Sequence, residues 1–240
     1  MFLEKKTSDK DIDMGLCYSI LQKCVRRCLV NESLYYGKLI FYDGTPNALR
    51  KRLVMYCLED MARLDLALEI FNSEDNKLIS YIQIVAKNKK SRITDWYNIV
   101  CYYSFHKKLE ISQENNEELL EGYKFMELQS KEDFKQIRKL LGNELSKLYT
   151  YMNKLSFVWV LKILWDRREE LRYPLDKTIE PIKAKKFFEI PKYALDKHVL
   201  NGTPGLKFFF ENGAVINNKI YKNEPYEIKA KKFSYMYENN

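Results

Sequence analysis

A helix-like stretch over residues 45–71, TPNALRKRLVMYCLEDMARLDLALEIF, is the feature that most constrains the fold. Thr45 can cap a helix start, and Pro46 suits the first helical position because its missing N–H costs nothing there. Apolar residues then recur at spacings of three and four, the period of one buried helix face; they are Leu49, Leu53, Cys57, Met61, Leu64, Leu68 and Phe71. The pattern predicts one helix from Pro46 to about Asn72.

Three consecutive bases, Arg50, Lys51 and Arg52, follow the start of this helix. The helix dipole disfavours cations at this end, so we expect them to meet a partner or a carboxylate elsewhere in the fold. A solvated basic face is the alternative interpretation. Glu59 and Arg63 stand four residues apart, about one helical turn, and this spacing predicts a structural ion pair.

Low glycine and proline contents, 8 and 6 residues in 240, favour long helices over a β architecture with many turns. Further helices are expected from Asp9 or Asp11 to residue 30, and over about 32–41, 78–88, 91–109 and 131–171, the last with Gly142 and Asn153 as candidate interruptions. We therefore predict a mainly α fold, a multi-helix bundle with a small irregular or β-hairpin-containing C-terminal part. The hairpin is expected over residues 215–221, around Asn217-Asn218.

A polar, acidic stretch centred on QENNEE at residues 113–118 is the best domain boundary. It predicts a helical unit over residues 1–110, a connector over 111–130, and long helices with a basic aromatic C-terminal region over 131–240.

Cysteine and histidine usage argues against a metal site. The five cysteines include no CxxC pair, and Cys17, Cys24 and Cys28 lie on one helical stripe, which favours buried, reduced thiols. With two histidines, a zinc site would need an unusual ligand set, so no metal and no cofactor are expected. No apolar run approaches a membrane span and no secretion signal is evident, so a cytoplasmic location without membrane attachment is expected.

A net charge of +8 and a pI near 9.0 suggest an anionic partner without identifying one. Aromatic residues alternate with lysines near the C-terminus, a pattern suited to single-stranded nucleic acid and equally to an aromatic core with lysines outside. The candidate nucleic-acid-binding residues are Arg50, Lys51, Arg52, Lys89, Lys90, Arg92, Lys229, Lys231 and Lys232.

Catalytic motifs are scarce. The chain has neither a GxxxxGK[ST] phosphate loop nor a GxSxG elbow. Asp196, Lys197 and His198 form the one dense group of catalytic residue types, and Gly202 and Gly205 follow them. The sequence first favours a structural turn, in which Asp196 caps and His198 packs against aromatic residues. The alternatives are that the loop clamps a phosphate or nucleic acid, or that it acts on a phosphorylated substrate.

Three segments between residues 6 and 105 resemble the helical C-terminal domain of the RarA/MgsA group of AAA+ ATPases, relatives of clamp loaders. The family's D-x-D-A-A-L-Y-W helix start is similar to DIDMGLCY at residues 11–18. Its A-R-R-L-V…A-S-E-D-I-G-L-A-D helix is similar to LRKRLV at 49–54 with LEDM at 58–61 and Asp65, and its A-x-x-P-K-S-N step is similar to AKNKKSR at 86–92. The ATPase module is absent, Ala62 stands in place of the family glycine, and Lys89 in place of the family proline.

The resemblance implies a clamp-loader-type helical domain and a non-enzymatic accessory role in DNA replication, recombination or repair. It also implies homo-oligomer assembly, contact with DNA, and a replication ATPase or polymerase complex as a further partner. Two alternatives remain open: an enzyme that uses Asp196, Lys197 and His198, and a structural assembly module that binds no nucleic acid.

Overall fold

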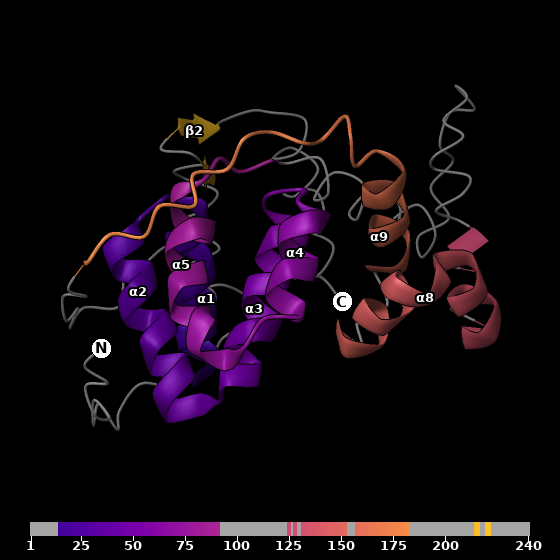
Figure 1. Cartoon of the computed structure of the whole chain (residues 1–240), viewed down its shortest axis with the longest axis horizontal. Coiled ribbons are helices and arrows are strands. Elements are labelled where there is room, and N and C mark those ends of the chain that lie inside the picture. Colours follow the sequence, from indigo (N-terminus) through magenta and orange to yellow (C-terminus); the bar gives the residue numbers. More distant parts are fainter. Residues whose placement is uncertain are drawn as a thin grey trace, which may run out of the picture. The chain divides into compact units, whose positions relative to one another are not determined.

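The computed structural model describes residues 14–91, 124–125, 127–128, 131–152, 157–182, 214–216 and 219–221 (Figure 1). The described residues are mainly helical, as predicted. The regular elements are α1 (Met14–Arg26), α2 (Val30–Leu39), the π-helical turn η1 (Ile40–Gly44), α3 (Pro46–Glu59), α4 (Leu64–Phe71), the 3-10 turn η2 (Asp75–Lys77), α5 (Leu78–Lys87), α8 (Phe134–Met152), α9 (Phe157–Asp166), β1 (Ala214–Ile216) and β2 (Lys219–Tyr221).

Two compact units divide the chain, and neither is continuous in sequence. The first unit combines Met1–Arg52, Glu74–Lys90 and Leu175–Asn240, and the second combines Leu53–Ser73 with Ser91–Pro174. Helix α3 therefore begins in the first unit and ends in the second. The predicted boundary over residues 111–130 lies almost entirely outside the described residues and stays a prediction.

The core of the first unit is built by α1, α2 and α5. Their facing side chains are fully or almost fully buried: Ile20, Leu21, Cys24, Leu34, Tyr36, Leu39, Ile82 and Val85. Gly37 permits a close approach of α2 to α5, because a Cβ atom at this position would lie 2.4 Å from Ile82 Cδ1. The absence of a side chain at residue 37 therefore has a packing reason.

The second unit packs α9 against α8 and against α4. Helix α8 has non-helical backbone angles at Gly142, with a φ of 74°, so one of the two predicted interruptions is confirmed. The other, Asn153, lies outside the described residues. The rings of Phe71 and Tyr151 meet at a centroid distance of 5.0 Å.

The predicted helix from Pro46 to Asn72 is wrong in one respect, because it is two helices. Helix α3 ends at Glu59 and α4 begins at Leu64, and Ala62 between them has a φ of 54°. This left-handed conformation cannot continue a right-handed helix. The apolar spacing survives the break because Met61 and Leu64 are buried on either side of Ala62.

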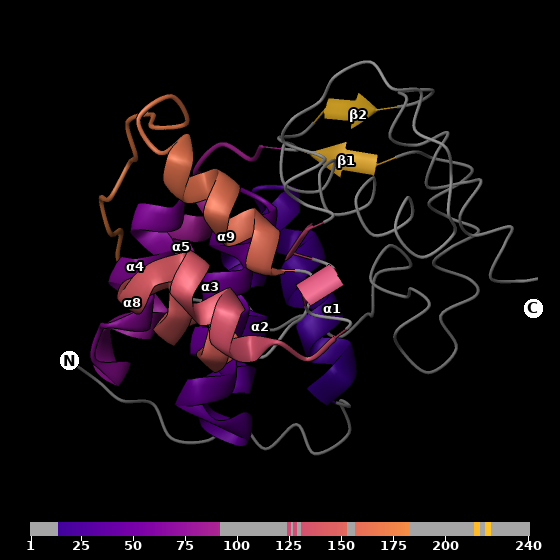
Figure 2. The ribbon, with the colours of Figure 1, turned by 90° about the vertical axis from the view of Figure 1, so that its right-hand side faces the viewer.

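The predicted first helix also breaks. It ends at Arg26, and Cys28, with a φ of 58°, precedes α2. Near the C-terminus, β1 and β2 form the expected antiparallel hairpin, with Val215 opposite Ile220 (Figure 2). No helix among the described residues has both the length and the apolar character needed to cross a membrane.

Candidate nucleic-acid interface

The start of α3 holds three of the predicted basic residues in three different environments. Thr45 caps the helix as predicted, since its Oγ1 accepts a hydrogen bond of 3.0 Å from the Ala48 N–H. Lys51 is exposed. The two arginines that flank it, Arg50 and Arg52, are each held by a neighbour in the first unit.

Arg50 binds a carboxylate, which is one of the two kinds of contact expected for a base at the unfavourable end of the helix dipole. Its Nη2 lies 2.5 Å from Asp75 Oδ1, and its side chain is 11% exposed. The Arg52 guanidinium lies over the Tyr18 ring, 4.4 Å from its centroid, a cation–π arrangement. Both contacts fix the directions of the arginines beside Lys51.

The prediction that Lys90 contacts phosphate is wrong, because its ammonium group is buried and bound to the backbone. The residue is 3% exposed, and its Nζ donates to the carbonyl oxygens of Val85 at 2.8 Å, of Ala86 at 3.0 Å and of Asn88. These carbonyls lie at the C-terminal end of α5, where helical partners are lacking and the dipole favours a cation. Lys90 is therefore a helix cap, while its neighbour Lys89 is exposed.

The two basic groups at Arg50–Arg52 and Lys89–Lys90 are not brought together as one surface. Arg50 binds Asp75 just before the N-terminal end of α5, and Lys89 follows the C-terminal end. Ten helical residues, at about 1.5 Å each, separate the two ends by about 15 Å. A ligand that contacts both groups would have to extend along α5.

The predicted ion pair of Glu59 with Arg63 is not formed, because α3 ends at Glu59 and residue 63 no longer lies one helical turn away. Arg63 instead donates from Nε to Asp65 Oδ1 at 2.7 Å and from Nη2 to Asp65 Oδ2 at 2.5 Å. Its Nη1 donates to the Tyr173 carbonyl at 2.5 Å, and its guanidinium lies 4.7 Å from the Tyr173 ring centroid.

This contact set explains the direction of the pKa shifts of Arg63 and Asp65, while burial determines that of Tyr173. The hydrogen bond to Asp65 raises the pKa of Arg63 above its ordinary value, although burial opposes it. Burial alone would raise the pKa of Asp65, but the hydrogen bond and charge of Arg63 outweigh it and lower that pKa. Burial also raises the pKa of the Tyr173 hydroxyl to about 12.

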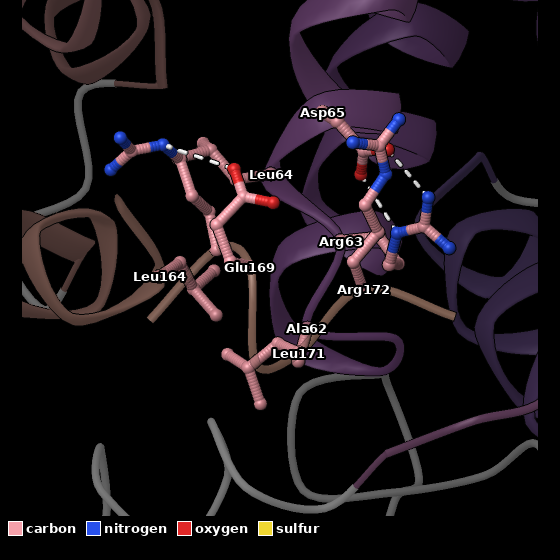
Figure 3. A pocket seen from close by; sticks show the side chains of 9 residues that line it. Ala62, Arg63, Leu64, Asp65, Leu164, Glu169, Leu171 and Arg172 are labelled. Atoms are coloured by element: carbon pink, nitrogen blue, oxygen red, sulfur yellow. Dashed lines mark hydrogen bonds and ion pairs between the residues drawn. The ribbon is translucent and has the colours of Figure 1, made fainter. Parts of the chain in front are cut away.

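A pocket of about 160 Å³ lies beside this ion pair in the second unit (Figure 3). Arg168 and Glu169 approach each other at 3.8 Å on one side, and Arg63 binds Asp65 on the other. Its lining consists of Ala62, Arg63, Leu64, Asp65, Leu164, Arg168, Glu169, Leu171 and Arg172. Both acidic residues in the lining are thus paired with arginines, so an incoming anion would compete with the two carboxylates for the arginine side chains.

The structure also holds an arrangement that sequence reasoning missed, a strap (residues 175–182) that lies along α5. The Asn88 side chain donates to the Asp176 carbonyl at 2.8 Å and accepts from the Asp176 N–H at 2.9 Å. In the same way, the Gln83 side chain donates to the Glu180 carbonyl at 2.9 Å and accepts from the Glu180 N–H at 3.1 Å. Each carboxamide thus satisfies both backbone groups of one extended residue. No sequence signal distinguishes Gln83 and Asn88 from surface polar residues.

The remaining candidates lie outside the described residues and stay predictions: Arg92, Asp196, Lys197, His198, Lys229, Lys231 and Lys232. Comparisons with models of protein families, with curated proteins and with solved structures found no match to this chain.

Proposed function

We propose that this protein is a non-enzymatic accessory factor of DNA replication, recombination or repair. In this proposal it oligomerises and contacts nucleic-acid phosphates through the basic turn of α3. The observation that carries the proposal is the exposed Lys51 between Arg50 and Arg52, whose side chains are fixed by Asp75 and Tyr18. The Arg52 guanidinium, already held over the Tyr18 ring, loses less conformational entropy when it binds phosphate, and Lys51 adds an exposed charge beside it.

A second observation supports the resemblance on which the cellular role depends. Ala62 has a φ of 54°, and it stands where the RarA/MgsA family has glycine. Glycine occupies this region of backbone angles without steric cost. A family glycine at this place therefore fits the backbone turn that separates α3 from α4 here.

The test is binding of labelled single-stranded and double-stranded DNA at two salt concentrations. Wild type is compared with Lys51→Ala/Arg52→Ala and with the charge-matched variant Lys135→Ala/Lys139→Ala, which removes two exposed lysines from α8. We expect affinity that falls steeply with salt because phosphate contacts release counterions. The first variant should bind about tenfold more weakly or worse, with a salt slope reduced by about two.

Equal losses in both variants would mean that general charge, and not the α3 turn, attracts DNA. No binding at low salt would reject direct DNA contact. Circular dichroism of each variant keeps misfolding from being mistaken for lost contact. The Lys90→Met variant should lose stability without losing DNA affinity, since Lys90 caps α5.

Oligomerisation is tested separately by light scattering over a range of protein concentrations. A mass that stays at one chain, 28.8 kDa, across this range would reject the assembly part of the proposal.

A further inference from the structure

The strap is held to α5 by polar contacts rather than by buried apolar side chains. Gln83 and Asn88 bind its backbone, and Lys87 binds Asp176 and Thr178. Ile179, the central apolar residue of the strap, is 46% exposed. A hydrogen bond stabilises by about as much as, or less than, the cost of ordering one residue, so such a segment is only marginally held.

The charged contact of the strap lies at the C-terminal end of α5. The Lys87 ammonium lies 2.9 Å from Asp176 Oδ1, and it donates to the Thr178 hydroxyl at 2.7 Å and to the Thr178 carbonyl. The Asp176 carboxylate also accepts from the N–H and the hydroxyl of Thr178, at 2.9 Å and 2.5 Å. An anionic oxygen, Asp176 Oδ1, is thus already bound to the Lys87 ammonium.

An anion at this end would ordinarily be opposed by the negative end of the helix dipole. Lys90 reduces that opposition, since its buried ammonium binds three carbonyls of the same helix end. Lys89 is exposed between the two other lysines. The helix end is therefore able to hold a negatively charged group, and Asp176 shows where that group binds.

We propose that the strap is a releasable latch, and that Lys87 is a further phosphate-contacting residue which the latch covers. A phosphate of the nucleic-acid backbone would replace the Asp176 carboxylate on the Lys87 ammonium, while Gln83 and Asn88 release the strap backbone. The phosphate part of this inference rests on the proposed function, and the latch part does not.

Native-state hydrogen exchange tests the latch without nucleic acid. The amides of Asp176, Thr178 and Glu180, which donate to side chains, should exchange at least about 100-fold faster than the buried interior of α5. The variants Gln83→Ala and, separately, Glu180→Pro, which removes the Glu180 N–H donor, should accelerate the remaining strap amides and spare those of α5. Asn88 is left unchanged because its side chain also donates to the Ile84 carbonyl of α5 at 2.8 Å. Strap amides that are as protected as α5 in wild type would overturn the latch.

DNA titration tests the phosphate role of Lys87. Asp176→Asn removes the competing charge, and we expect up to about fivefold tighter binding with a salt slope steeper by about one. Adding Lys87→Ala to that variant should cancel the gain. The matched control is Glu144→Gln, which makes the same charge change at an exposed position of α8 and should change affinity less.

The outcomes separate the two proposals. Binding that depends on Lys51 and Arg52 but does not tighten in Asp176→Asn would overturn the role of Lys87 alone. Equal tightening in Asp176→Asn and Glu144→Gln would overturn it as well, because total charge would then explain the gain. No salt-dependent binding by wild type or any variant would overturn the proposed function and the phosphate role together, and hydrogen exchange would still decide the latch.

Discussion

At the scale of single residues, charged side chains in this protein often serve the fold before they serve a ligand. Arg50 binds Asp75, Arg63 binds Asp65, and Lys90 caps α5. Each of these contacts satisfies a group that would otherwise lose water without compensation on burial. Lys51, which is exposed at the start of α3, is a better candidate for ligand contact than these three residues.

Ala62 makes a prediction at this scale. Its left-handed backbone costs a residue with a Cβ about 1–2 kcal/mol, and glycine avoids that cost while losing some chain entropy on folding. We expect Ala62→Gly to stabilise the protein by about 0.5–1 kcal/mol, seen as a higher midpoint of urea unfolding. The control Ala67→Gly, at a buried helical position in α4, should destabilise by about 1 kcal/mol or more. A loss of stability in both variants would contradict the strain argument.

At the scale of elements, packing depends on where helices approach closely and where polar side chains replace apolar contact. Helix α5 shows both kinds of contact. Ile82 packs against Gly37 of α2, while Gln83 and Asn88 bind the strap. A single helix therefore packs in the core of the first unit and also binds the strap, which follows it in the sequence by about ninety residues.

The contact of α2 with α5 predicts a paired mutational effect. Gly37→Ala should destabilise by about 1–2 kcal/mol, because the new Cβ would lie 2.4 Å from Ile82 Cδ1 and the tight core resists repacking more than the gain in helix propensity offsets. Ile82→Val removes that Cδ1 atom. The double variant Gly37→Ala/Ile82→Val should therefore be more stable than the sum of the single effects, as measured by a double-mutant cycle of chemical unfolding. Strict additivity would show that the two residues do not meet.

The strap predicts a pH dependence. Hydrogen bonds from Thr178 and Lys87 lower the pKa of Asp176 to about 2, from an ordinary value of 3.8. A carboxyl with a lowered pKa stabilises its contacts above the ordinary value, and that contribution is lost as the pH falls. We expect the strap to stay bound near neutral pH and to detach progressively as the pH falls from about 4 to about 2, as followed by the Thr178 amide signal in NMR spectra. Asp176→Asn should abolish this transition, and its persistence in that variant would assign it to another group.

At the scale of the whole molecule, the chain leaves its first unit after Arg52, returns over Glu74–Lys90 and returns again from Leu175. The described thiols fall in both units, with Cys17, Cys24 and Cys28 in the first and Cys57 in the second. Cys17, Cys24 and Cys57 are buried, whereas Cys28 is partly exposed. The predicted burial is therefore confirmed for these three and is wrong for Cys28, because α1 ends at Arg26 before the stripe reaches it. Cys101 lies outside the described residues.

Thiol accessibility checks this arrangement in solution. We expect iodoacetamide to label Cys28 at least about tenfold faster than Cys17, Cys24 or Cys57 in the native protein, because a buried thiol reacts only when the structure opens. Mass mapping of the labelled peptides measures the four rates. Denaturant should make the rates similar, which serves as the control. Fast native labelling of Cys17 would contradict the packing of α1.

The sequence by itself determined the helical class of the fold, because apolar spacings of three and four favour helices whatever packs against them. It also determined the Thr45 cap and the Gly142 break, since both depend on local backbone chemistry. The tertiary structure decided the rest. Lys89 and Lys90 are adjacent and chemically identical, and it is the fold that buries Lys90 and leaves Lys89 exposed. The binding of the strap by Gln83 and Asn88 joins residues about ninety positions apart, and no local pattern records a contact of that range.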